Sequence, residues 1–240
     1  MNLRVQRRVL AILVGVLLLL PLLPAAPTLA QSPLDVVELG KRSGGIAADW
    51  SRGLIWVAVE GQVLAYDAAT LTKQAEIALP NNYYLCANVA VNSSLGRVYA
   101  VGSTRVFVVD ATSNTVVANL GQGGYDAVVN PLTNRLYMAY SSNRSYFLRV
   151  LNGADNTWLP DVPIATTSSY SGYWVRVAVD AVLNRIYVTY SETDTLFVFD
   201  GISHQELAQM SLEDIGYVAV NSNTRRLYVE TTAGVAVFDS

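Results

Sequence analysis

Aromatic, amide and charged side chains gather just before a series of short apolar segments, and they are the sequence's best candidates for chemistry. Tyrosine and tryptophan combine a flat apolar ring with a polar tip, which suits both sugar rings and protein partners. The residues that we predict to bind a ligand are Tyr84, Asn88, Tyr125, Asp126, Tyr173, Trp174, Arg176 and Tyr217. No complete catalytic set accompanies them, so the pattern favours binding.

Catalytic and metal chemistry has few candidates in this chain. His204 is the single histidine and Cys86 the single cysteine, so metal sites built on histidine or cysteine lack ligands, and an intrachain disulfide is impossible. A Ser-His-Asp arrangement would need a nucleophile beside His204, and the sequence holds no Gly-x-Ser-x-Gly elbow. We interpret His204 as a turn residue and Cys86 as a small buried hydrophobe. We expect no catalytic residue, no metal and no cofactor.

The candidate residues belong to a fivefold repeat. Five short apolar runs end in Asp or Asn, at Asp49, Asn92, Asn130, Asp180 and Asn221. Seven residues beyond each of these stands an aromatic residue: Trp56, Tyr99, Tyr137, Tyr187 and Tyr228. In each copy a second apolar run ends 18 to 22 residues beyond the Asp or Asn that ends the first run, at Asp67, Asp110, Asn152, Asp200 and Asp239. One internal spacing found five times indicates five copies of one structural unit.

Each copy has the pattern of four antiparallel strands. The first run is apolar throughout, as expected of a strand buried on both faces. The Asp or Asn that ends it, with Gly or Asn four residues later (Gly53, Asn134), suits a hairpin loop with one left-handed residue; Arg225 departs from this rule. We interpret the repeated Asp and Asn residues as structural groups that order neighbouring copies, together with Arg97, Arg135, Arg185 and Arg226.

Four strands every ~40 residues without helical periodicity predict an all-β, five-bladed β-propeller of four-stranded antiparallel blades. The repeats span about 44–80, 87–121, 125–165, 175–213 and 216–240, within one domain over 31–240. The last repeat stops after its third strand, and residues 35–40 resemble the fourth strand 115–121. We therefore expect the N-terminal strand to complete the last blade and close the ring, which removes two exposed sheet edges. The alternative is a fragment of a larger ring.

The repeat resembles a known family. Residues 177–199, with Tyr-Val-Thr-Tyr at 187–190, are similar to the YVTN β-propeller repeat, and 228–231 and 99–102 are looser versions. The final Asn of the family's motif is absent throughout, and the first repeat has Trp56 in place of Tyr. The resemblance covers 35–240 and implies an extracytoplasmic or surface-layer-like propeller, a class mostly without assigned activity.

Strand direction places the loops that enter each first strand on one face of the predicted disc, with the loops between second and third strands. We therefore predict a non-enzymatic binding or scaffold module that contacts a glycan or a protein through this tyrosine-rich face. The alternative is a propeller-type glycoside hydrolase or another hydrolase, which would need two carboxyl groups facing each other at the channel mouth. Only Asp126 is acidic there, and its partner would come from Glu60, Glu192 or Asp194. A purely structural wall component is a third possibility that the sequence does not separate from the first.

The N-terminus and the charge predict where the protein works. Arg4, Arg7 and Arg8, an apolar stretch over 9–20 and small residues at 28–30 are typical of a signal peptide over 1–30. A retained membrane anchor is the alternative. We expect a secreted, periplasmic or cell-surface protein with a glycan or protein partner at the cell envelope, and no membrane insertion after cleavage. Loss of the three arginines takes the formal net charge from −3 to −6, which disfavours nucleic acid as a partner.

Overall fold

The computed structural model describes residues 36–80, 86–167 and 174–240. The chain divides into two units, Met1–Glu38 and Leu39–Ser240, and every strand lies in the second unit. The expected signal segment, 1–30, lies outside the described residues. Within the described ranges, no helix is long and apolar enough to cross a membrane.

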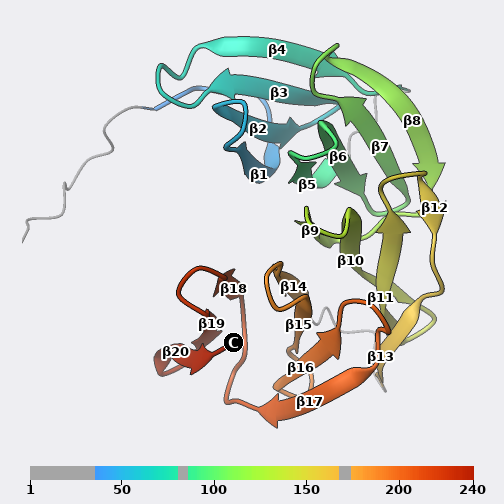
Figure 1. Ribbon diagram of the computed structural model, residues 1–240, viewed down its shortest axis with the longest axis vertical. Coiled ribbons are helices and arrows are strands. Elements are labelled where there is room, and N and C mark those ends of the chain that lie inside the picture. The colour runs from blue at the N-terminus through green and yellow to red at the C-terminus, as the bar shows by residue number, and fades with distance from the viewer. Residues whose placement is uncertain (1–35, 81–85, 168–173) are drawn as a thin grey trace, which may run out of the picture. The chain divides into compact units, whose positions relative to one another are not determined.

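The second unit consists of five antiparallel sheets, one for each predicted repeat (Figure 1). Repeat 1 contains β1 (Ser43–Asp49), β2 (Leu54–Val59), β3 (Gln62–Asp67) and β4 (Lys73–Ala78). Repeat 2 contains β5 (Cys86–Asn92), β6 (Arg97–Gly102), β7 (Arg105–Asp110) and β8 (Thr115–Gly121). Repeat 3 contains β9 (Asp126–Asn130), β10 (Arg135–Ser142), β11 (Ser145–Asn152), β12 (Thr157–Trp158) and β13 (Val162–Thr166). Repeat 4 contains β14 (Val175–Asp180), β15 (Arg185–Tyr190), β16 (Thr195–Asp200) and β17 (Glu206–Ser211), and repeat 5 contains β18 (Val218–Asn221), β19 (Arg226–Thr231) and β20 (Gly234–Asp239).

Strand order within each sheet follows the chain, as expected from hairpins. The first strands, β1, β5, β9, β14 and β18, lie on the inner side of their sheets, and each of the first four contacts the first strand of the following repeat (Figure 1). Repeat 3 departs from the expected pattern, because β12 and β13 both pair with β11 in place of one fourth strand. Pro160 lies between them and has no N–H for a ladder bond.

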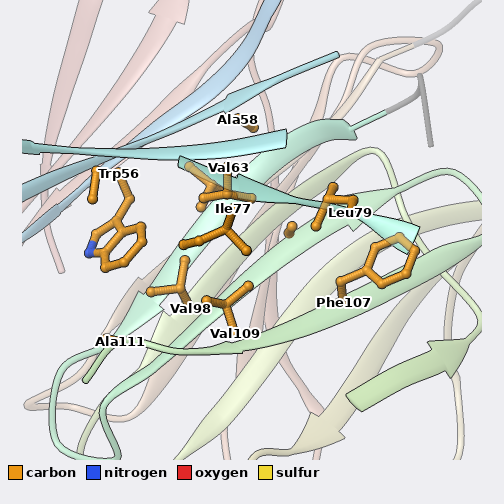
Figure 2. Packing of buried hydrophobic residues seen from close by; sticks show 12 residues of the cluster. Trp56, Ala58, Val63, Ile77, Leu79, Val98, Phe107, Val109 and Ala111 are labelled. Atoms are coloured by element: carbon orange, nitrogen blue, oxygen red, sulfur yellow. The ribbon is translucent and has the colours of Figure 1, made fainter. Parts of the chain in front are cut away.

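Apolar cores fill the spaces between consecutive sheets. In Figure 2 the side chains of Trp56, Val63 and Ile77 from repeat 1 meet Val98 and Val109 from repeat 2. Similar clusters join repeats 2 and 3, 3 and 4, and 4 and 5. Each fully buried aliphatic or aromatic side chain contributes about 1.5–3 kcal/mol by leaving water, so stability is distributed over the interfaces.

The prediction that the first strands are buried on both faces is wrong for repeats 1 and 5. Exposed and half-buried residues alternate along β1 and β18, whereas β2, β3, β6, β7 and β15 carry long buried runs. In repeats 1 to 4 the second and third strands lie in the middle of the sheet, whereas β20 of repeat 5 is itself an edge strand with exposed and half-buried residues. A first strand is a sheet edge and depends on the first strands beside it for cover.

In repeats 1 to 3 the aromatic residue of the second strand reaches the residue that follows the third strand of the next repeat. Tyr137 donates its hydroxyl to Gly201 O at 3.0 Å, and Trp56 packs in one cluster with Ala111. A Cβ added to Gly153 would lie 2.3 Å from the Tyr99 hydroxyl oxygen. The repeated spacing therefore sets a large side chain against a small one at each of these interfaces.

In repeats 1 to 4 the Asp or Asn that ends the first strand joins the next repeat, as the sequence predicted, whereas Asn221 of repeat 5 is exposed and accepts the backbone N–H groups of Asn223 and Thr224 in its own turn. Ser93 Oγ donates to Asp49 Oδ1 (2.8 Å), and Ser240 Oγ donates to Asp180 Oδ2 (3.0 Å). The amides of Asn92 and Asn130 donate to Oδ1 of Asn134 (3.0 Å) and Asn184 (2.8 Å), respectively. Asp49, Asn92, Asn130 and Asp180 are all fully buried. Buried polar groups need such partners, because an unpaired one costs about 1–3 kcal/mol.

The arginines behave differently from the prediction. Arg97 and Arg226 form ion pairs inside their own sheets, with Asp110 (2.5 Å) and Asp239 (2.6 Å). Arg135 does reach the next repeat, where Nη1 donates to Gly201 O. The ordering role predicted for these arginines is therefore wrong for Arg97 and Arg226, since each of them lies opposite its own aspartate partner on the adjacent strand of the same sheet.

The predicted turn residues adopt the left-handed conformation. Gly53, Gly96, Asn134 and Asn184 have φ between 52° and 63°, and Arg225 shares it at 52° although it carries a full side chain. His204 has φ 59° in the turn after β16, which confirms its turn role. Its ring lies edge-on to Tyr137. Burial, with the nearby Arg135 charge, lowers the pKa of His204.

Closure of the ring stays a prediction. Among the described residues, 36–42 form no strand and β20 pairs with β19 alone, so the sheet of repeat 5 has three strands here.

Substitution of Gly153 by alanine tests the large-against-small contact. The new Cβ would lie 2.3 Å from the Tyr99 hydroxyl oxygen and 2.8 Å from Asn134 O, and overpacking of this kind costs about 1–3 kcal/mol. We expect a fall of about 2–12 °C in melting temperature. Gly121→Ala is the matched control, since nothing lies within 4 Å of its added Cβ. Equal melting temperatures for the two variants would refute the contact.

The Asp49 bond predicts how stability depends on acid. Burial alone would raise the pKa of Asp49, but hydrogen bonds from Ser51, Ser93 and Arg52 outweigh it and hold the pKa below its usual value of 3.8. The folded protein therefore binds a proton here less readily than the unfolded chain, and the stabilisation present above pH ~4 is lost as the pH falls further. Urea unfolding from pH 6 to pH 2 should show a shallower acid loss for Asp49→Asn than for the wild type. A parallel loss in both proteins would contradict the assignment.

Candidate functional site

In each repeat, the residue just before the apolar run of the first strand is predicted to face the channel mouth. These five residues are Gly45, Asn88, Asp126, Arg176 and Tyr217. The structure joins them in sequence. A Cβ on Gly45 would lie 2.1 Å from Asn88 Oδ1, Asn88 Nδ2 donates to Asp126 Oδ1 at 2.7 Å, and the guanidinium carbon of Arg176 lies 4.6 Å from the Tyr217 ring centre. Equivalent positions of consecutive repeats therefore touch at this end of the first strands.

Asp126 connects three repeats. Its Oδ1 accepts from Asn88 of repeat 2 and from the Ala127 backbone (3.1 Å), and its Oδ2 accepts the backbone N–H of Val177 in repeat 4 at 2.9 Å. Burial raises the pKa of Asp126, while the Val177 N–H and the positive charge of Arg176 oppose that rise. Both oxygens are engaged by the scaffold, which gives Asp126 a positioning role.

A buried arginine on β11 holds the segment that leads to Tyr125 and Asp126. Arg149 on β11 donates to Gly123 O (3.1 Å) and forms a two-pronged ion pair with Asp161 (3.0 and 3.1 Å). Its guanidinium also lies 3.6 Å from the Tyr140 ring centre. Such an arrangement satisfies a buried charge on several sides, and it fixes the backbone that presents Asp126.

Arg176 lies between two exposed aromatic rings. Its guanidinium carbon is 5.0 Å from the ring centre of Trp174 and 4.6 Å from that of Tyr217. The ring of Trp174 is 63% exposed and that of Tyr217 65% exposed. Cation–π contacts of this kind contribute about 0.5–1 kcal/mol at exposed sites, so the three side chains support one another while leaving aromatic surface open.

These three side chains border a cavity of about 450 Å³ between repeats 4 and 5. Its lining is Trp174, Arg176, Asp214, Gly216, Tyr217, Glu230, Thr231 and Thr232. Glu230 Oε2 accepts the backbone N–H of Tyr217 at 3.0 Å, and Asp214 Oδ2 accepts the Thr232 hydroxyl at 2.7 Å. The cavity thus combines aromatic faces, a guanidinium and two oriented carboxylates.

The structure brings together part of the predicted site. Trp174, Arg176 and Tyr217 share the cavity. Asp126 and Asn88 do not line it, although Asp126 interacts with the charge of Arg176 and is bonded to Asn88. Tyr125 is half exposed on its own loop and does not line this cavity. Tyr84 and Tyr173 lie outside the described residues.

Sequence reasoning missed Asp214, Glu230, Thr231 and Thr232. The hairpin between second and third strands contributes Glu60, Arg105, Asn143, Arg144, Glu192 and Asp194 in repeats 1 to 4. The same alignment in repeat 5 points to Glu230–Thr232, so the repeat itself carried the signal. Glu192 accepts from the hydroxyls of Tyr190 and Thr167, and Asp194 accepts the Ile215 N–H. Both of these candidate acids are therefore bound to scaffold groups.

Comparisons with known proteins bear on the fold. No protein-family model and no curated protein matches this sequence. Among solved structures, the Myceliophteria thermophila Cps50 (Swd1) beta-propeller domain aligns with a TM-score of 0.69 at 9% identity, over 87% of this chain and 68% of that one. The fold is a β-propeller. A chain of a nidogen/laminin complex aligns with a TM-score of 0.62 at 15% identity, over 83% of this chain and 76% of that one.

In a β-propeller each of the five sheets is one blade, numbered like its repeat. The cavity therefore lies between blades 4 and 5. At these identities the likeness shows the fold and nothing finer. Membership of the YVTN repeat family stays a prediction.

Asp126 should give a pH slope opposite to that of Asp49. Because its pKa is raised in the folded protein, the folded state binds a proton more readily than the unfolded chain, and stability falls as the pH rises above ~4 through the raised pKa. The stability advantage of the wild type over Asp126→Asn should shrink over that interval, by no more than about 1.4 kcal/mol per pH unit. Urea unfolding from pH 3.5 to 7 measures this. An advantage that grows with pH would show that the carboxylate is not desolvated.

Proposed function

We propose that this chain is a non-enzymatic, extracytoplasmic β-propeller binding or scaffold module that contacts a glycan or protein partner through the loop face bearing Trp174, Arg176 and Tyr217. The observation that carries the proposal is the pair of exposed aromatic rings held by Arg176 at the rim of a cavity. Rigid, partly exposed aromatic residues with an arginine are the side chains that dominate binding energy at interfaces.

The geometry supports binding better than hydrolysis at the channel mouth. A glycoside hydrolase needs one carboxyl group to protonate the leaving oxygen and a second to attack or to activate water. Both oxygens of Asp126 accept hydrogen bonds from scaffold groups of Asn88, Ala127 and Val177, which favours a structural role for this carboxyl group over proton exchange with a substrate. One of the similar solved chains comes from a nidogen/laminin complex, which illustrates that a chain of this fold can be part of a protein assembly.

The proposed location rests on the N-terminal residues. Arginines at 4, 7 and 8, the apolar stretch 9–20 and the small residues at 28–30 are the pattern of an exported protein. An envelope location would give the loop face access to glycans and surface proteins.

We further propose that residues 35–40 complete blade 5 as its fourth strand. The support is a cavity of about 400 Å³ beside β20, lined by Leu207, Met210, Phe238 and their neighbours. Leu207 and Met210 are exposed there, and a fourth strand on β20 would cover apolar surface of this kind. Residues 35–40 carry apolar side chains at spacings comparable to those of β8.

A binding screen with one face altered tests the function. The full-length protein is screened by thermal shift against wall polymers, glycans and envelope proteins, and a ligand at 100 times its dissociation constant adds about 2.7 kcal/mol, or about 5–10 °C. The double variant Trp174→Ala/Tyr217→Ala should lose the shift, because both exposed rings are removed.

The control is Trp50→Ala. Trp50 is 85% exposed and lies in the β1–β2 turn at the opposite end of the first strands, so its removal should leave the shift unchanged. Shifts that survive the double variant but vanish with Trp50→Ala would move the binding face to the other side of the disc and overturn the proposal.

A further inference from the structure

We propose that the cavity between blades 4 and 5 is a subsite for a neutral glycan of two or three pyranose rings. This proposal rests on the proposed binding function and specifies the class of its ligand. Four properties of the cavity lead to this class: its two open ring faces, its mixture of donors and acceptors, its charge and its size.

The first property is the aromatic surface. A pyranose ring carries a face of C–H groups and a rim of hydroxyls, so it needs a flat apolar surface beneath it and polar groups around it. Trp174 and Tyr217 each direct one ring face at Arg176. With 63% and 65% of their surface exposed, both keep apolar ring surface available at the rim.

The second property is the polar lining. Glu230 Oε2 and Asp214 Oδ2 are held by the Tyr217 N–H and the Thr232 hydroxyl. Glu230 Oε1 and Asp214 Oδ1 have no hydrogen-bond partner among the described residues, so they remain free to accept. Among the described residues, the hydrogen bonds that Arg176 donates are two long ones, to Val175 O (3.3 Å) and to the Tyr217 hydroxyl (3.5 Å), which leaves guanidinium N–H groups available to a ligand.

Sugar hydroxyls use both kinds of group, because each one donates and accepts. A hydroxyl that donates to a carboxylate or accepts from a guanidinium makes a charge-assisted hydrogen bond, which is about twice as strong as a neutral one. The fixed oxygen on each carboxylate also means that little rotational freedom is lost when the other oxygen binds a ligand.

The third property is charge. Two carboxylates, Asp214 and Glu230, face one guanidinium in this cavity, within a domain that is itself acidic. A uronate, sulfate or phosphate ligand would be repelled by the carboxylates. A cationic ligand would compete with Arg176 for the aromatic faces that it already covers. An uncharged ligand with many hydroxyls meets neither penalty.

The fourth property is size and shape. A volume of about 450 Å³ falls in the range of small-molecule sites, about 300–1,000 Å³. A protein–protein interface of standard size buries about 800 Å² on each partner, which requires a wider surface than this cavity offers. A short stretch of glycan fits the cavity, and a longer chain could leave it along the loop face.

Titration with defined oligosaccharides tests this subsite. The full-length protein is titrated with neutral trisaccharides of glucose, mannose and N-acetylglucosamine, and with trigalacturonate as the anionic probe, by calorimetry and by tryptophan fluorescence. We expect saturable binding of at least one neutral probe, weaker binding of trigalacturonate, and a change in the fluorescence of Trp174.

Three variants locate the binding. Trp174→Ala should weaken the neutral probe at least tenfold, because it removes the stacking surface. Glu230→Gln keeps the size and one carbonyl acceptor but loses the charge, and should weaken binding about three- to tenfold. Trp50→Ala, on the far face, should leave the affinity within twofold. Melting temperatures of all variants show that loss of binding is not loss of folding.

Absence of saturable binding to every neutral probe at 10 mM, in a protein that melts cooperatively, would overturn the glycan subsite, and so would a preference for trigalacturonate. Binding that is indifferent to Trp174→Ala and Glu230→Gln would place the glycan elsewhere and overturn it as well. A protein partner that is lost with Trp174→Ala/Tyr217→Ala, without any oligosaccharide binding, would refute the glycan class and leave the binding module intact.

Discussion

In blades 1 to 4, a fully buried Asp or Asn at the end of the first strand bonds to the following blade, and the placement of one blade against the next depends on it. The bond from Ser93 to Asp49 and the amide bonds from Asn92 and Asn130 lie at the same position in successive blades. A buried polar group tolerates few alternatives to its partner. The bonds therefore select one offset between sheets, whereas the apolar contacts beside them would accept several.

The remaining contacts between blades follow from that offset. Seven residues after the buried Asp or Asn, the aromatic side chain meets a small residue of the next blade, as Tyr99 meets Gly153 and Tyr137 meets Gly201. At the other end of the first strands, Asn88, Asp126 and Val177 continue the connection. Blades 2, 3 and 4 thus share polar contacts at both ends of their first strands.

The candidate site lies where the side chains at the repeated positions differ in type from those of the other blades. Between blades 4 and 5 the equivalent positions hold Arg176 and Tyr217, and an aromatic stack replaces the hydrogen bonds of Asp126. A cavity bordered by Glu230 and Asp214 lies beside these two side chains. A repeat protein builds its scaffold from what the copies share and its specificity from what one copy alters.

The sequence was sufficient for the parts of the structure that repeat. The spacing of Asp49 and Trp56 and of their counterparts predicted the strands and the five sheets, and the turn role of His204 was correct. The split edge of β12 and β13 was not predicted, because it lies at Pro160, which this one copy carries outside the shared pattern. Glu230 and Asp214 were missed because a site between two blades depends on which side chains meet in space. The expected first-strand burial failed in blades 1 and 5, since the cover of an edge strand is set by its neighbours and not by its own apolar residues.

A double-mutant cycle on Asp49 and Ser93 tests most directly whether the buried bonds set one blade against the next. The free energy of unfolding is measured for the wild type, Asp49→Ala, Ser93→Ala and the double variant. If the buried bonds position the blades, we expect a coupling energy of about 0.5–3 kcal/mol between the two positions. Effects that add to within about 0.3–0.5 kcal/mol would contradict it, and would mean that apolar packing alone positions the blades.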